Sequence, residues 1–175
     1  MLARRKDRLL ELDLPDTICE KVDITNIDAI REAVQKAEDK FGPVDCLINN
    51  AGIMLLGLVW EQDPSEWQRM VDINGVGLLN GIHVVLKDMI DRQKGTIINI
   101  SSIAGRKTYP NHAVYCGTKF AVHAMSENIR EEVADKNVRV ITIAPGPVET
   151  ELLSHTSKTT ALKHLENRTH CMFFS

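Results

Sequence analysis

Short apolar segments alternate with longer helical segments along this chain, and this alternation limits the possible folds more than any other feature. Strands are predicted over residues 17–22, 46–49, 96–100 and 138–143. Helices are predicted between them, over about 27–41, from 64 onward and over about 112–136. Such alternation builds a parallel sheet with helices on both faces. The sequence therefore predicts one doubly wound α/β domain, in which ligands bind beyond the carboxyl ends of the strands.

Local signals indicate where two of these helices begin and end. Thr25 and Asp28 form a capping-box pattern, in which a hydroxyl and a carboxylate satisfy free N–H groups, so Thr25 is the predicted cap. The helix after it is predicted to stop at Gly42. Asp63 and Pro64 begin the next helix, whose interior glycines favour either close packing of another backbone or a kink. Those glycines are Gly75, Gly77 and Gly81.

The composition excludes several classes of protein. The chain has 175 residues, a net charge of −3 and 43% hydrophobic residues, which suits a globular domain and not a disordered chain. The weak acidic charge argues against nucleic acid or a membrane surface as a partner, and no apolar run reaches the ~20 residues of a membrane span. The cysteines lack metal-ligand spacing, so no metal site is predicted, and they are interpreted as thiols in the reducing cytoplasm. They are Cys19, Cys46, Cys116 and Cys171.

Small and polar residues follow three of the predicted strands. Residues 50–52 come after the strand at 46–49, Ser101 and Ser102 come after the strand at 96–100, and residues 144–150 come after the last strand. Small residues let a flat ligand approach the backbone. Any one such turn is a weak signal, because a strand followed by a glycine turn is common.

Tyr115 and Lys119 form the strongest chemical signal. Because they are four residues apart on a predicted helix, their side chains lie one above the other. A phenol with its usual pKa of about 10 is a poor acid at neutral pH, and a neighbouring ammonium is predicted to lower that pKa. Ser102, at the end of a strand, would hydrogen-bond the oxygen that Tyr115 protonates. The alternative interpretation of the Tyr–Lys pair alone is an exposed helix face.

Five motifs together resemble the short-chain dehydrogenase/reductase family. They are NNAG at 49–52, the Asn of DING at 72–75, INISS at 98–102, YCGTK at 115–119 and PGPVET at 145–150. Their order and spacing match over about residues 1–152. The resemblance implies a Rossmann fold and an oxidoreductase that transfers a hydride between a nicotinamide cofactor and a carbonyl or alcohol carbon. It also implies a small-molecule substrate, whose identity is not predicted, and a homo-oligomer.

The resemblance implies four catalytic residues. Tyr115 would be the general acid in reduction, and Ser102 would polarise the substrate oxygen. Ser102 is preferred to Ser101 because it stands thirteen residues before Tyr115, where the family has its serine. Lys119 would lower the pKa of the phenol and hold the nicotinamide ribose. Asn74 would support a proton relay through water.

Cofactor contacts follow from the same residue-by-residue match. Asp23 and Ile24 would border the adenine, and residues 50–52 would border the adenosine ribose. Val148 would meet the carboxamide, and Thr150 would reach the phosphates. The implied cofactor-binding set is Arg4, Arg5, Asp23, Ile24, Asn50, Ala51, Gly52, Tyr115, Lys119, Pro145, Gly146, Val148 and Thr150.

The cofactor is expected to be NADP rather than NAD. Ala3 stands where NAD-preferring relatives carry an acid, and Arg4 and Arg5 follow it. A guanidinium at this place suits a 2′-phosphate. The alternative is an ordinary solvated run of charges, because the segment ARRKDR is highly charged.

Parts of the family pattern are missing, so the sequence is expected to be truncated at both ends. Residues 1–153 are predicted to form an incomplete Rossmann domain that lacks the first strand, the glycine-rich loop and the last strand, and 154–175 a polar tail of uncertain structure. The first strand is central in this sheet order, so its neighbours would have unpaired edges. The chain is therefore expected to bind NADPH weakly or not at all. The alternative function is an inactive fragment that acts at most as an oligomerisation or interaction module.

Overall fold

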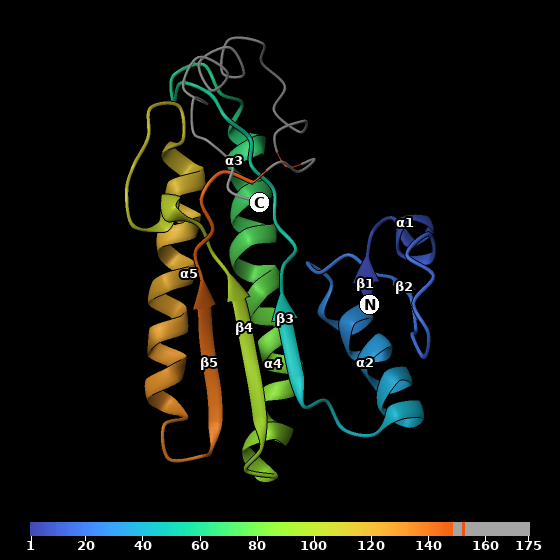
Figure 1. The fold of residues 1–175 in the computed structure, drawn as a ribbon. Coiled ribbons are helices and arrows are strands. Elements are labelled where there is room, and N and C mark those ends of the chain that lie inside the picture. Colours follow the sequence, from blue (N-terminus) through green and yellow to red (C-terminus); the bar gives the residue numbers. More distant parts are fainter. Residues whose placement is uncertain (149–151, 153–175) are drawn as a thin grey trace.

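The computed structural model describes residues 1–148 and Leu152, and Figure 1 shows the ribbon. The helices and strands are, in chain order, β1 (Leu2–Ala3), α1 (Lys6–Leu10), β2 (Glu20–Lys21), α2 (Ile27–Phe41), β3 (Cys46–Asn49), α3 (Pro64–Val71), the π-helix η1 (Asp72–Val76), α4 (Gly77–Asp91), β4 (Gly95–Ile100), the 3₁₀ helix η2 (Ile103–Gly105), α5 (Ala113–Glu132) and β5 (Val138–Ile143). The predicted alternation of strands and helices is confirmed. Thr150 and the predicted tail at 154–175 lie outside the described residues.

The strands form two sheets, and every strand pair in the described part of the chain is parallel. β1 pairs with β2, and the second sheet has the order β3-β4-β5. The predicted parallel α/β architecture is therefore confirmed. Because β3, β4 and β5 run in the same direction, the residues that follow them meet at one edge of the sheet (Figure 1).

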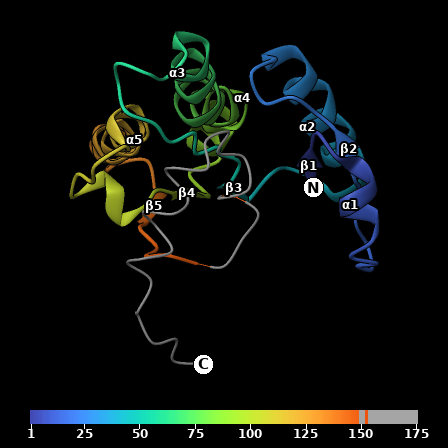
Figure 2. The same cartoon turned by 90° about the horizontal axis from the view of Figure 1, so that it is seen from above.

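Helices α4 and α5 both lie on one side of the three-stranded sheet, as Figure 2 shows from above. Each connects neighbouring parallel strands, and right-handed crossovers in the same direction place both helices on the same face. Every second residue of β4 is buried against them, including Ile97 and Asn99. On β5, Ile141 and Ile143 stay exposed. Within the described residues, no helix has both the length and the apolar character needed to cross a membrane.

A cavity of about 790 Å³ lies between the two sheets. Its walls include Leu2 of β1, Leu47 of β3 and three apolar side chains from helices, Ile30, Leu78 and Val85. Within residues 1–148, β1 is paired only with β2, and β3 is paired only with β4. The prediction of unpaired strand edges is therefore confirmed.

The helix α2 begins one residue later than its sequence pattern indicates. The side chain of Asn26 accepts a hydrogen bond from the Ala29 N–H at 3.0 Å and caps the helix, so the prediction that Thr25 is the cap is wrong. The physical reason is that the Thr25 hydroxyl donates to the carboxylate of Asp23 at 2.8 Å instead. At the other end the prediction is confirmed, because Gly42 ends α2 with a φ of 84°.

The helix predicted from residue 64 is interrupted by a turn of π-helix. Asp63 caps its start, as predicted, with its side chain accepting from the Ser65 N–H. The π-helix η1 then separates α3 from α4. A Cβ on Gly77 would lie 2.6 Å from Ile24, and one on Gly81 would lie 2.7 Å from Asn49. These glycines therefore allow close packing, as predicted, but of neighbouring side chains rather than of another backbone.

Candidate active site

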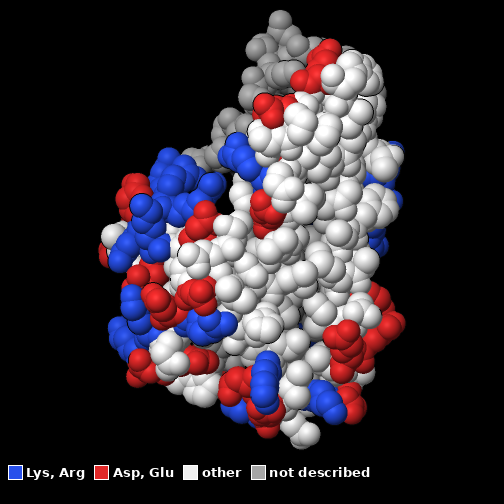
Figure 3. Space-filling model, turned by 180° about the vertical axis from the view of Figure 1, so that it is seen from behind, with Lys and Arg blue, Asp and Glu red and all other residues white. Residues whose placement is uncertain are grey.

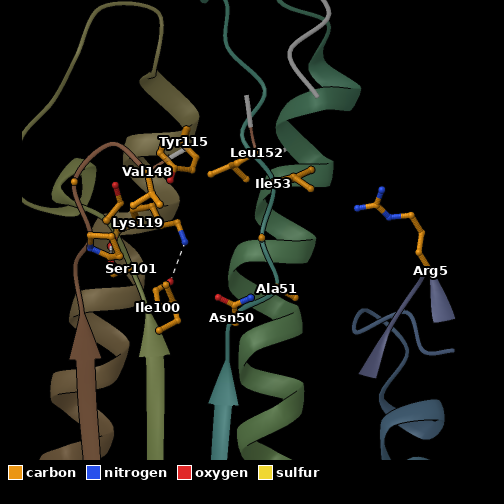
Figure 4. Close-up of a pocket in the computed structure, with 14 residues that line it drawn as sticks. Arg5, Asn50, Ala51, Ile53, Ile100, Ser101, Tyr115, Lys119, Val148 and Leu152 are labelled. Atoms are coloured by element: carbon orange, nitrogen blue, oxygen red, sulfur yellow. Dashed lines mark hydrogen bonds between the residues drawn. The ribbon is translucent and has the colours of Figure 1, made fainter. Parts of the chain in front are cut away.

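A cavity of about 480 Å³ opens at the carboxyl ends of β3, β4 and β5. Figure 4 shows Tyr115 and Lys119 projecting from α5 on one side, with the loop after β3 opposite them and Arg5 reaching in from the end of β1. The residues that line it are Arg5, Asn50, Ala51, Gly52, Ile53, Ile100, Ser101, Ser102, Tyr115, Lys119, Pro145, Gly146, Val148 and Leu152. The structure thus brings most of the predicted site residues into one place.

Three of the predicted cofactor residues lie elsewhere. Arg4, Asp23 and Ile24 line the larger cavity between the two sheets. Arg5 and residues 50–53 line both cavities, so the two spaces adjoin. Asp23 accepts hydrogen bonds from Thr25, and these lower the pKa of its carboxyl. The charge of Arg4 lowers the same pKa by a smaller amount. The residues predicted to border the adenine therefore lie beside the catalytic cavity, with the loop after β3 between them.

Tyr115 and Lys119 are both buried. The phenol ring is 5% exposed and the lysine is 7% exposed. They stand one turn apart on α5, and Lys119 Nζ lies 5.9 Å from the centre of the Tyr115 ring. Lys119 Nζ donates a hydrogen bond to the Ile100 carbonyl at 3.0 Å, which Figure 4 shows as a dashed line. The alternative interpretation of the pair as an exposed helix face is therefore wrong.

Burial sets the protonation of this pair. It raises the pKa of the Tyr115 phenol above its usual value, and a hydrogen bond with Ser102 opposes this effect only in part. Burial also lowers the pKa of the Lys119 amine to about 8. The predicted lowering of the phenol's pKa by Lys119 is thus not found, because loss of solvent is the dominant effect on the phenol. The phenol is held in its protonated form.

The two serines after β4 play different parts in the structure. Ser101 is buried, and its Oγ donates to the Lys119 carbonyl at 3.1 Å. Ser102 caps the short helix η2 by accepting from the Ala104 N–H at 3.1 Å, and its side chain acts to lower the pKa of the Tyr115 phenol. Ser102 lines the same cavity as Tyr115, which favours it over Ser101 as the residue that would hydrogen-bond the same substrate oxygen as the phenol.

Asn74 lies in the π-helix η1 and is 2% exposed. Its Oδ1 accepts from the Ile53 N–H at 2.8 Å, and its Nδ2 donates to the Ile53 carbonyl at 2.9 Å. The same Nδ2 donates to Thr118 Oγ1 at 3.1 Å. The side chain is therefore occupied by contacts within the protein, so any support for a water relay would have to come from the backbone of Asn74.

Thr118 is the site residue that sequence reasoning missed. It is buried on α5 between Tyr115 and Lys119. The available signal was weak: a β-branched residue is a poor helix former, and here it stands inside a long helix. Its partner Asn74 is distant in the sequence, so only the folded chain reveals the contact.

Known proteins resemble the chain in sequence and in fold. The profile of the family described as short chain dehydrogenase matches residues 3–161. An uncharacterized oxidoreductase of Staphylococcus saprophyticus is 40% identical over 161 residues, which cover 89% of this chain and 65% of the relative. The solved structure of serine dehydrogenase from Escherichia coli is 34% identical with a TM-score of 0.75, and the match covers 83% of this chain and 69% of that one. A closed form of serine dehydrogenase complexed with NADP+ is 31% identical with a TM-score of 0.85, and the match covers 98% of this chain and 71% of that one.

The chain is shorter than the relatives that it matches. It spans 65% of the first Staphylococcus saprophyticus relative and 58% of a second oxidoreductase from the same species. The second relative is 39% identical over 135 residues, which are 77% of this chain. Activity, substrates and partners of the whole protein therefore go beyond what these matches establish.

Proposed function

Because the chain belongs to the short-chain dehydrogenase family, we propose that it carries the catalytic centre of an NADP-dependent oxidoreductase. The reaction moves a hydride between the cofactor and the carbonyl or alcohol carbon of a small molecule. The observation that carries this proposal is the buried pair of Tyr115 and Lys119 at the cavity wall, with Ser102 lining the same cavity. An interaction module would gain nothing from a buried phenol beside a buried amine.

In the direction of reduction, Tyr115 is the proton donor. The cofactor, when bound, supplies a hydride to the substrate carbon. Negative charge then develops on the substrate oxygen, and the Tyr115 hydroxyl gives its proton to that oxygen, which yields the alcohol. Ser102 donates a hydrogen bond to the same oxygen and stabilises the developing charge. The raised pKa of Tyr115 supports this role, since it keeps the phenol protonated at neutral pH.

Lys119 stabilises the phenolate that forms when Tyr115 has given up its proton. After proton transfer the phenol oxygen carries a negative charge, and Lys119 Nζ lies 5.9 Å from the ring centre. With a pKa of about 8, the amine is mostly charged at neutral pH and attracts the phenolate. The same ammonium is available to hydrogen-bond ribose hydroxyls of the cofactor.

The cavity fits the nicotinamide end of a dinucleotide. A Cβ at Gly52 would lie 3.2 Å from Asn74 Oδ1 and 3.7 Å from Lys119 Nζ, so a side chain there would fill the space beside the lysine. Glycine keeps this space open for a ligand. Val148 lines the same cavity and would meet the carboxamide.

The preference for NADP is supported by charge and by similarity. Arg4 and Arg5 stand at the end of β1, each lining a cavity of the site, where a guanidinium would bind a 2′-phosphate. The similar serine dehydrogenase structure contains NADP+. Replacing both arginines by Ala should weaken NADPH binding more than NADH binding, which titration of both cofactors would reveal.

The decisive experiment is Tyr115→Phe. We expect NADPH consumption with a panel of ketones and aldehydes to fall by ~10²–10⁴-fold, because the variant keeps the ring and loses only the proton donor. Circular dichroism should show that the fold is kept. Carbonyl reduction that is equally fast in Tyr115→Phe and in the parent chain would refute the proposal.

A second candidate function is an oligomerisation module, and one surface favours it. Figure 3 shows a broad uncharged surface on the side where α4 and α5 lie, while charged side chains gather around it. Val76 at the end of η1, Leu79 of α4 and Phe120 of α5 are 45%, 40% and 42% exposed. We propose that two copies pair through this face. Sedimentation velocity should show a dimer or larger assembly that Phe120→Glu dissociates, and a monomeric parent chain would contradict this.

The proposed location is the cytoplasm. Cys19, Cys46 and Cys116 carry free thiols. Free thiols are typical of reducing compartments. Fractionation of cells that produce the protein would test this location.

A further inference from the structure

A buried series of hydrogen bonds connects the catalytic helix to the loop after β3. Thr118 Oγ1 donates to the Tyr115 carbonyl at 2.8 Å and accepts from Asn74 Nδ2 at 3.1 Å. Asn74 in turn makes paired hydrogen bonds with the backbone N–H and carbonyl of Ile53. Thr118 and Asn74 are 6% and 2% exposed, so solvent cannot replace these partners easily.

The Thr118 hydroxyl favours the same orientation of the Asn74 amide that its paired hydrogen bonds with Ile53 require. A hydroxyl has one proton, and Thr118 uses it toward the Tyr115 carbonyl. The oxygen can therefore only accept from Asn74, which requires the NH₂ group to point at Thr118. In the reversed orientation, Oδ1 of Asn74 would face the Thr118 oxygen and the Ile53 carbonyl, and all three atoms are acceptors. Thr118 thus favours the orientation in which Oδ1 receives the Ile53 N–H.

The segment held in this way borders the lysine. Ile53 follows Gly52, where a Cβ would be 3.7 Å from Lys119 Nζ. Residues 50–53 line the catalytic cavity opposite Tyr115 and Lys119 (Figure 4). The hydrogen bonds from Thr118 through Asn74 to Ile53 therefore connect the two walls of this cavity.

Local structural preferences alone do not explain Thr118 in α5 or Asn74 in the π-helix η1. Threonine is a poor helix former, yet Thr118 is in the middle of α5. Asn74 sits in a π-helix, an irregular turn that is frequent at functional sites. Their mutual hydrogen bond offers a physical reason for both.

We propose that Thr118 is a positioning residue for the catalytic site. Its hydroxyl orients Asn74 and through it holds residues 50–53 at a fixed spacing from Tyr115 and Lys119. The consequence for catalysis rests on the proposed oxidoreductase function. The consequence for the loop is independent of it and can be measured in the chain without substrate.

The test compares Thr118→Val, which removes the hydroxyl at nearly constant shape, with Thr118→Ser, which keeps it. Amide hydrogen exchange at Ile53 is the first readout. We expect about tenfold faster exchange in Thr118→Val, since one buried hydrogen bond and its partner are lost, and near-parent exchange in Thr118→Ser. Gly117→Ala is the matched control, because an added Cβ there meets nothing within 4 Å.

The second readout is catalytic. If the proposed function holds, Thr118→Val should lower kcat for carbonyl reduction by about tenfold and raise KM for NADPH, and Thr118→Ser should restore both. Unchanged Ile53 exchange in Thr118→Val, or equal acceleration in Thr118→Val and Thr118→Ser, would overturn the proposal. If Thr118→Val does not fold, Thr118→Ala takes its place under the same criteria.

The two proposals fail in different ways. Absence of reduction in a parent chain that titration shows to be saturated with NADPH, together with the expected exchange pattern, would refute the oxidoreductase function and leave the positioning of the loop supported. Tyr115→Phe should abolish reduction without changing Ile53 exchange, since the phenol hydroxyl is not part of this hydrogen-bond series. Faster Ile53 exchange in Tyr115→Phe would show that the phenol hydroxyl also holds the loop, which contradicts the proposed series.

Discussion

At the scale of single residues, burial governs the chemistry of the candidate site. Lys119 and Tyr115 have lost nearly all contact with solvent. Removing water disfavours charged forms, so it lowers the pKa of the ammonium and raises that of the phenol. Sequence spacing predicted the opposite direction for Tyr115, because spacing reports the neighbouring charge and not the loss of solvent.

Burial of Lys119 should appear as a pH dependence of stability. The amine has a usual pKa of 10.5 and a pKa of about 8 in the folded chain. Between these values the unfolded chain binds the additional proton, so the free energy of unfolding rises with pH. We expect the parent to gain about 2 kcal/mol over Lys119→Met between about pH 8 and 10, as measured by urea denaturation. The raised pKa of Tyr115 changes the free energy of unfolding only above the usual phenol pKa of 10.0, which is outside the range of about pH 8 to 10.

The control for this experiment is an exposed lysine. Lys21 lies on the surface of β2. Lys21→Met should leave the pH dependence of the parent unchanged. Parallel stability curves for the parent and Lys119→Met would show that the amine is not buried in solution.

At the scale of elements, the contact between η2 and α5 brings together the two segments that carry the proposed catalytic residues. Ser102 caps η2, and α5 carries Tyr115 and Lys119. Gly105, the last residue of η2, lies so near α5 that a Cβ would be 2.6 Å from the Lys119 carbonyl and 2.5 Å from a ring atom of His123. No side chain fits there without movement of one element.

Gly105→Ala should therefore destabilise the chain. We expect a loss of about 1–3 kcal/mol in the free energy of unfolding, because backbone on α5 cannot give way as a flexible side chain could. Gly117→Ala on the same helix should instead stabilise by about 0.5–1 kcal/mol, since it removes a helix-interior glycine without steric contact. Equal stability of the two variants would contradict the close approach of η2 and α5.

The ends of the helices show which structural features the local sequence can predict. The Asp63 cap and the Gly42 stop are interactions within a few residues, and both were predicted correctly. The Thr25 cap was wrong because the hydroxyl had a competing partner in Asp23. The π-helix η1 was not predicted, since its interactions with Ile53 and Thr118 come from distant parts of the chain.

At the scale of the whole molecule, helix packing rather than strand pairing joins the two sheets. Helix α2 packs against α4, and Asn80 Nδ2 of α4 donates to the Ile24 carbonyl at 3.0 Å. The space between β1 and β3 is the cavity of about 790 Å³. Within the described residues, Asp23 and Ile24, which are predicted to border adenine, are therefore connected to the cavity of Tyr115 and Lys119 through helices and one loop.

This arrangement predicts weak cofactor binding by the chain itself. Asp23 and Ile24 line the open cavity, and their position relative to Lys119 is not fixed by a continuous sheet. Ordering the two halves around one ligand has an entropic cost that weakens affinity. A fluorescence titration with NADPH should show weak binding or none, and micromolar affinity would contradict the prediction.

The sequence by itself determined the parallel α/β architecture, most helix limits and most of the residues that share the cavity. It could do so because alternation, caps and strand-end residues are local patterns that follow from backbone geometry. Only the tertiary structure decided the protonation of Tyr115 and Lys119, the partners of Asn74, the role of Thr118 and the space between the two sheets. Each of these depends on solvent exclusion or on contacts between segments far apart in the chain, which no local pattern records.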